Sequence, residues 1–184
     1  MSSPCPGNLK VSCEKARQAP RSFATGATLP MAEFNNLVFA DTDVLINWLA
    51  HEKESQTARP LWPAVEKILL AIQNKKLRGA TSIITIMEVR AFLRRGTRIS
   101  KKQVEKEINK INSLLNILVP NDITLLLANQ IQIDTSLMPI DSIQLAIVQE
   151  NSPATLVTRD KELLLAAKGL ACSATPEELS AALK

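Results

Sequence analysis

One segment constrains the fold of this chain more than any other: residues 37–46, with the sequence Leu-Val-Phe-Ala-Asp-Thr-Asp-Val-Leu-Ile. Its apolar beginning has the length and composition of a buried strand in a parallel sheet. Two carboxylates, Asp41 and Asp43, follow that strand at once. In open α/β sheets, ligands bind in the crevice beyond the carboxyl ends of the strands. Because an acid is costly to bury unpaired, Asp41 must either meet a cation or accept local hydrogen bonds.

Strand-like and helix-like segments alternate along the chain from Met31 onward. Apolar runs predict further strands at 80–85, 117–119, 155–158 and 170–173. Helical spacing of apolar residues, with Pro or Ser near several helix starts, predicts helices at 60–76, 86–95, 122–132, 139–150 and 161–168, another from Ser100 and a last one after Pro176. Such alternation is typical of α/β proteins in which helices cover both faces of a mostly parallel sheet.

Residues 1–30 have a different composition, with Pro, Ser, Gly and scattered basic residues and no periodic apolar pattern. We expect a disordered N-terminal extension there, followed by one domain over 31–184. A mis-assigned translation start before Met31 is the leading explanation, and an organellar presequence is the weaker one. Four Lys or Arg and one Glu lie in 1–30, so the formal charge falls from +4 for the chain to +1 for 31–184. The charge of the domain is therefore weak support for nucleic-acid binding.

The cysteine pattern and the hydropathy exclude several classes of protein. The three cysteines, Cys5, Cys13 and Cys172, lack a CxxC spacing and have only one histidine to accompany them. Neither a disulfide framework nor a zinc site is supported, and a reducing cytoplasm is the expected compartment. No segment approaches the roughly 20 apolar residues of a membrane span.

Four acids recur beyond the predicted strands: Asp41, Glu88, Asp141 and Asp160. Three of them also have a purely structural explanation. Glu88 would complete a capping box with Thr85, Asp141 suits the positive end of a helix, and Asp160 would cap the helix at 161–168. At one edge of a parallel sheet, however, four carboxylates repel one another, and a divalent cation relieves that repulsion. Mg²⁺ or Mn²⁺ prefers carboxylate oxygens and can promote hydrolysis of a phosphodiester.

A group of basic residues lies between two predicted helices and includes Arg90, Arg94, Arg95 and Arg98. One interpretation is a solvated basic face, which helices commonly expose. The other is a track for phosphate groups, because an acidic centre without neighbouring cations repels RNA. The sequence leaves both interpretations open.

The acids lie in four short motifs: Asp41-Thr-Asp-Val-Leu-Ile, Ser-Ile-Ile-Thr-Ile-Met-Glu88, Pro-Ile-Asp141-Ser-Ile-Gln-Leu-Ala and Leu-Val-Thr-Arg-Asp160-Lys-Glu-Leu. In order and spacing, this set resembles the four acidic motifs of PIN domains, particularly those of VapC-like ribonuclease toxins, and the resemblance covers 31–184. It implies a PIN-like three-layer α/β/α fold around a central, mostly parallel sheet. It also implies a cytoplasmic, metal-dependent endoribonuclease, a hydrolase that forms the toxin half of a toxin–antitoxin pair.

The resemblance carries over to particular residues. Asp41, Glu88, Asp141 and Asp160 match the acidic positions that bind Mg²⁺ or Mn²⁺ and catalyse hydrolysis, with Asp41 and Asp141 favoured as direct ligands. Thr158 matches the hydroxyl residue two positions before the last acid. Asp43 stands at a position where Asn is frequent in the family. We expect Thr158 and Asp43 to lie next to the four acids and to support them through hydrogen bonds rather than bind the metal. The implied partners are an RNA substrate and a cognate antitoxin protein, with a homodimer left open and no membrane.

Two alternatives remain at this stage. The Asp41-Thr-Asp43 spacing also resembles that of HAD-like phosphatases, in which the first Asp is a nucleophile. Leu45 and the single late acid Asp160 fit that motif poorly. The other alternative is a catalytically inactive PIN-fold module that binds RNA or protein, against which the complete set of four acids argues.

Overall fold

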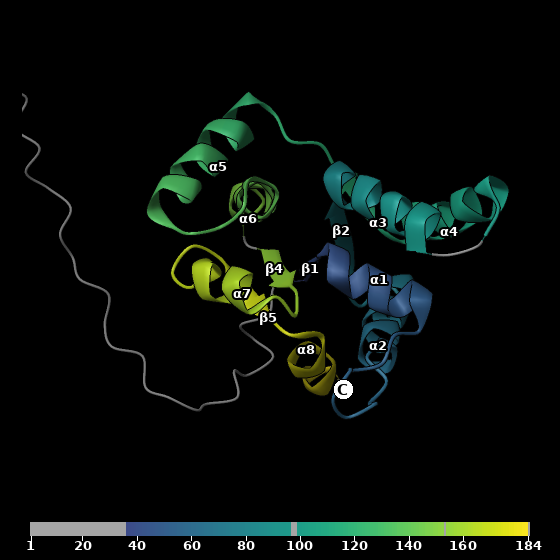
Figure 1. The fold of residues 1–184 in the computed structure, drawn as a ribbon. Coiled ribbons are helices and arrows are strands. Elements are labelled where there is room, and N and C mark those ends of the chain that lie inside the picture. Colours follow the sequence, from purple (N-terminus) through teal and green to yellow (C-terminus); the bar gives the residue numbers. More distant parts are fainter. Residues whose placement is uncertain (1–35, 97–98, 153, 184) are drawn as a thin grey trace, which may run out of the picture.

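The computed structural model describes residues 36–96, 99–152 and 154–183, which form a central sheet with helices on both faces (Figure 1). All strand pairs are parallel, in the order β3-β2-β1-β4-β5. The strands are β1 (Leu37–Ala40), β2 (Arg78–Ser82), β3 (Asn116–Leu118), β4 (Ala154–Val157) and β5 (Cys172–Ala174). The predicted α/β class and parallel sheet are confirmed.

The helices form two layers. They are α1 (Thr42–Ala50), α2 (Trp62–Gln73), α3 (Ile83–Gly96), α4 (Lys101–Leu114), α5 (Asp122–Asp134), α6 (Pro139–Glu150), α7 (Lys161–Ala167) and α8 (Pro176–Ala182). Helices α1 to α4 and α8 share one hydrophobic core on one face of the sheet, and α5 to α7 share a second core on the other face (Figure 1). The predicted three-layer α/β/α arrangement is therefore confirmed.

Strand β1 lies at the centre of the sheet and contributes to both cores. Val38 and Ala40 point into the core of α1 to α4 and α8, whereas Phe39 points into the core of α5 to α7. All three side chains are almost completely buried. This explains why the segment is a continuous apolar run rather than an alternating one, because a strand covered on both faces needs apolar residues at every position.

The boundary between β2 and α3 differs from the prediction. The strand ends at Ser82, not at residue 85, and α3 begins at Ile83. The Ser82 hydroxyl accepts a hydrogen bond from the backbone N–H of Thr85 at 2.9 Å, as an N-terminal cap does. Thr85 consequently lies within the first turn of the helix. The capping box predicted for Thr85 and Glu88 is wrong, and Glu88 is left without a helix-capping role.

Two parts of the sequence-based predictions fall outside the described residues. These are the extension at 1–30, together with the domain start predicted at Met31, and Arg98 in the basic group. Within the described ranges, none of the helices combines the length and the apolar character that crossing a membrane requires.

Candidate active site

Strands β1 and β4 bring two distant segments together at one edge of the sheet. They pair in parallel with Ala40 opposite Val157, so the residues that follow each strand lie side by side. Asp41 follows β1 and Thr158 follows β4, and the Thr158 hydroxyl donates to Asp41 Oδ2 at 2.7 Å. This hydrogen bond agrees with the supporting role predicted for Thr158.

Asp41 is the most buried acid of this edge, with 5% of its surface exposed. Its Oδ1 atom accepts from the backbone N–H of Thr42 at 2.6 Å, as the N-cap of α1. Burial, followed by the neighbouring charge of Asp43, raises the pKa of Asp41 to about 7, although hydrogen bonds from Thr158 and Thr42 lower it and Asp141 adds a further increase. In the metal-free protein, the two hydrogen bonds therefore do not offset the cost of placing a negative charge on the buried Asp41 side chain.

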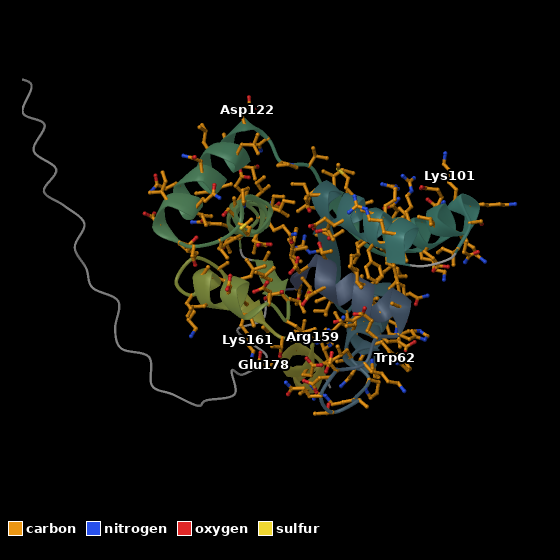
Figure 2. The ribbon with its side chains drawn as sticks, viewed as in Figure 1. Trp62, Lys101, Asp122, Arg159, Lys161 and Glu178 are labelled. Carbon is orange, nitrogen blue, oxygen red and sulfur yellow. The ribbon has the colours of Figure 1, made fainter. Side chains whose placement is uncertain are left out.

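Asp43 lies in the first turn of α1, behind Asp41. Its Oδ2 atom accepts from the backbone N–H of Arg159 at 2.8 Å. Its Oδ1 atom is buried and has no hydrogen-bond partner in the described part of the chain. Burial raises the pKa of Asp43, against the backbone hydrogen bonds from Arg159 and Val44. Figure 2 shows Arg159 close to the start of α8, where its guanidinium meets Glu177.

Glu88 lies one turn into α3 and faces the start of α1. The Thr42 hydroxyl donates to Glu88 Oε2 at 2.5 Å, and the Gln144 side-chain amide lies 3.4 Å from the same oxygen. Glu88 thereby joins α1, α3 and α6. Neither Thr42 nor Gln144 was identified from the sequence. A signal for Gln144 was present, because it is a polar residue inside an otherwise apolar stretch of α6 and is 1% exposed.

Asp141 and Asp160 complete the acidic edge from the other side. Asp141 occupies the first turn of α6 as predicted, and burial followed by the charges of Asp160, Glu88 and Glu162 raises its pKa. Asp160 caps α7, with Oδ1 accepting from the backbone N–H groups of Glu162 and Leu163 at 2.7 and 3.1 Å. The capping role predicted for Asp160 is confirmed. Glu162, in the first turn of α7, is a further acid that the sequence reasoning did not select.

The donor set suits a hard divalent cation. Among the described residues, no three His, Cys, Asp or Glu side chains converge closely enough to form a ready-made metal site. Mg²⁺, however, is usually held by one or two carboxylates and retains several waters, so it needs no cage of protein ligands. The buried Oδ1 of Asp43 without a partner and the mutual repulsion of the acids fit a cation at this edge. After burial, Asp43 and Asp141 add to the raised pKa of Asp41, and Asp160 and Glu88 add to that of Asp141, so electrostatic repulsion connects the four predicted acids.

The comparison with family models identifies the family of this chain. The sequence model of the PIN domain family matches residues 38–169, well over half of the chain. The chain belongs to the PIN domain family. The match begins within β1 and extends through α7, so it includes all four motifs that carry the acids.

Solved structures share the PIN fold with this chain at low sequence identity. A toxin–antitoxin complex from Klebsiella pneumoniae is 21% identical, with a TM-score of 0.54, over 76% of this chain and 97% of the other. VapBC2 from Rickettsia felis, bound to a DNA fragment from its promoter, is 15% identical, with a TM-score of 0.55, over 76% and 98%. VapBC-1 from nontypeable Haemophilus influenzae is also 15% identical, with a TM-score of 0.57, over 76% and 98%. The search of curated proteins gives no match.

The basic group of this PIN domain divides into two kinds of arginine. Arg90 and Arg94 both form ion pairs with Glu105 of α4, at 3.1 and 3.2 Å. Arg95, in contrast, has no acidic partner within the described ranges, and it lines an open pocket of about 490 Å³ together with Glu88, Ala91 and Phe92. The solvated-face interpretation thus fits Arg90 and Arg94, and Arg95 remains free to meet an anion beside the acidic edge.

Proposed function

We propose that this protein is a metal-dependent endoribonuclease and the toxin of a toxin–antitoxin pair. One observation carries the proposal: beyond the carboxyl ends of the strands, acids from four separate motifs are close enough to act on one another's charge, and the pKa of the most buried one, Asp41, is raised to about 7, mainly by burial. Keeping such a group without a cation costs stability, and this cost is accounted for if the site binds a metal and acts on an anionic substrate.

The residues of the chain have distinct roles in the proposed reaction. Asp41 and Asp141 would bind Mg²⁺ or Mn²⁺, and Glu88 and Asp160 would complete the acidic edge. When bound, the metal activates water and stabilises charge on the leaving oxygen of the phosphodiester. Thr158 and Thr42 orient the carboxylates of Asp41 and Glu88 through the hydrogen bonds that they donate. Arg95 would attract a phosphate of the RNA toward the pocket beside Glu88.

The proposed partners come from the similar structures. These structures are a toxin–antitoxin complex and two VapBC assemblies, one of them bound to promoter DNA. We infer that this chain also binds a cognate antitoxin, and a homodimer is compatible with the same proposal. We place the protein in the cytoplasm because the one cysteine in the described ranges, Cys172, is exposed and unpaired, as reducing compartments permit.

Cleavage of RNA with and without metal tests the proposed activity. Purified wild-type protein should cleave a mixed pool of RNA in Mg²⁺ or Mn²⁺ and not in excess EDTA. Asp41→Asn and Asp141→Asn should each lower the cleavage rate by at least a hundredfold. Asp122→Asn is the matched control, because Asp122 is an exposed acid in the first turn of α5 (Figure 2) and should leave the rate unchanged.

Two other outcomes would replace the proposal. Full activity in both Asn variants would remove the acids from catalysis. A folded protein that binds RNA or an antitoxin but cleaves nothing would be the inactive PIN-fold module. Because the chain belongs to the PIN family, the HAD-like phosphatase is no longer a candidate. That alternative would have required turnover of small phosphomonoesters through a phosphorylated Asp41.

A further inference from the structure

Gln144 is a buried polar side chain next to the acidic edge. It belongs to α6 and is 1% exposed. Its side-chain nitrogen lies 3.4 Å from Glu88 Oε2 and 3.5 Å from Thr42 Oγ1. Both distances are longer than is usual for an N–H···O hydrogen bond, so Gln144 is a weaker partner of Glu88 than Thr42, whose hydroxyl lies 2.5 Å from the same oxygen.

The chemistry of the neighbours decides which end of the amide faces them. Glu88 carries acceptor oxygens only, and the Thr42 hydroxyl uses its proton to bond Glu88. Both groups therefore need a donor from Gln144, which the NH₂ group supplies. The carbonyl oxygen, Oε1, is bonded to the same carbon and lies within about 2.3 Å of that nitrogen by covalent geometry. This oxygen is buried and has no partner among the described residues.

A buried acceptor without a partner is costly, and replacing an amide by an apolar side chain removes that cost. Within the described residues, the NH₂ group of Gln144 alone has partners, Glu88 and Thr42, while Oε1 has none. Beside a set of acids that fits a divalent cation, the NH₂ group has a use beyond structure, because it restrains Glu88.

We propose that Gln144 is a positioning residue that holds Glu88, together with Thr42, in the orientation required for metal binding at the acidic edge. The inference rests on the proposed function, since it presupposes that this edge binds a divalent metal. It goes further because it assigns part of the metal affinity to a neutral side chain that contacts no other acid of the site through a hydrogen bond in the described ranges.

Titration of the protein with Mn²⁺, followed by calorimetry, tests the inference without relying on cleavage. Gln144→Met keeps the length of the side chain and removes its donor and acceptor, and it should weaken Mn²⁺ binding by about tenfold or more. Gln149→Met is the matched control. Gln149 lies on the same helix, and its side-chain oxygen also lacks a partner among the described residues, yet it makes no hydrogen bond to the acids there. The control should bind Mn²⁺ within twofold of wild type.

A double-mutant cycle identifies Glu88 as the residue through which Gln144 acts. In an E88Q background, Gln144→Met should cause no further loss of Mn²⁺ affinity. The metal-free melting temperature, measured for every variant, verifies that each one is folded, and Gln144→Leu replaces Gln144→Met if that variant does not fold.

Three results would overturn the role of Gln144 alone: Mn²⁺ affinity of Gln144→Met within twofold of wild type, an equal loss in Gln149→Met, or additive losses in the double mutant. If wild type itself bound no Mn²⁺, the proposed metal-dependent function would fail together with this inference. The wild-type titration therefore separates failure of the function from failure of the Gln144 role.

Discussion

At the residue scale, the charge of Asp41 dominates the energetics of the site. The side chain is 5% exposed, and two hydrogen bonds do not compensate for its burial and for the neighbouring acids. In the unfolded chain the same group titrates near its ordinary pKa of 3.8. At a pH between these two pKa values, Asp41 is therefore protonated in the folded, metal-free protein and ionised in the unfolded chain. This difference makes the stability of the fold depend on pH.

The first prediction follows from that link. The pKa of Asp41 is higher in the folded protein than in the unfolded chain. Protonation of Asp41 therefore contributes fully to the free energy of unfolding below pH 3.8, and this contribution is lost as pH rises through about 7. The free energy of unfolding in EDTA should fall over this range by at most about 4 kcal/mol. Asp41→Asn should flatten that decline and be the more stable protein at pH 8. Urea denaturation at pH 5 and pH 8 measures both effects, and identical pH dependences would contradict the prediction.

The second prediction separates two arginines of α3. Arg94→Ala removes a side chain already paired with Glu105, whereas Arg95→Ala removes a cation that faces the pocket beside Glu88. Only Arg95→Ala should clearly weaken RNA binding and reduce the slope of log affinity against log salt, by roughly 0.7. Fluorescence anisotropy with single-stranded RNA, in an Asp41→Asn background that prevents cleavage, measures the slope. Equal slopes in both variants would show that Arg95, like Arg94, belongs to a solvated basic face and makes no phosphate contact.

At the element scale, Arg159 connects the end of the sheet to three helices. Its guanidinium donates to Asn47 Oδ1 of α1, to the Leu61 carbonyl before α2 and to Glu177 Oε1 of α8, at 2.5, 2.7 and 2.8 Å. Its backbone N–H meanwhile holds Asp43. One residue thus anchors the C-terminal helix and, through its backbone, supports the acidic edge.

The third prediction is that Arg159→Met lowers the free energy of unfolding by about 3 kcal/mol, because several partly buried acceptors lose a charged donor together. Arg59→Met is the control. Arg59 pairs with Glu54 at 3.7 Å with both side chains well exposed, so its loss should cost less than about 1 kcal/mol. Urea denaturation at pH 7 compares the two, and equal effects would contradict the anchoring role.

The pH dependence of the Arg159 effect provides a further control. Although burial raises it, the hydrogen bond and charge of Arg159 give Glu177 a pKa below its ordinary 4.5. A lowered carboxyl pKa stabilises the fold above the unfolded value and stops doing so as pH falls through the folded value. The difference between wild type and Arg159→Met should therefore narrow in acid. A constant difference would show that Glu177 contributes little.

At the scale of the whole molecule, the PIN fold has a hydrophobic core on each face of one parallel sheet. The fourth prediction is that deletion of residues 1–30 leaves the melting temperature within about 2 °C and RNA cleavage unchanged. The segment supplies no patterned apolar face that would add to either core. Thermal denaturation and cleavage assays of the shortened protein test this.

Two results of the same deletion would mean something else. A large loss of stability would show that the segment packs against the domain. Weaker RNA binding with unchanged stability would show that its surplus of three positive charges assists substrate capture.

The α/β class, the order of the elements and the four acidic motifs were all predictable from the sequence. Strands buried on both faces appear as apolar runs, and helices appear through their spacing of apolar residues, so each leaves a local pattern. The capping role of Asp160 was also local, since its partners are two and three residues away. Helix starts were less predictable: the Ser82 hydroxyl, not Thr85 and Glu88, caps α3.

Only the tertiary structure decided which side chains meet. Thr42 contacts Glu88 across 46 positions and Gln144 across 102, and Arg90 and Arg94 find Glu105 on another helix. Such pairs depend on strand register and on how helices pack over the sheet, and neither leaves a pattern within a few residues of sequence. The sequence by itself therefore determined the kind of fold and the acids at its edge, whereas packing determined which neighbours contact those acids and which arginines pair with Glu105.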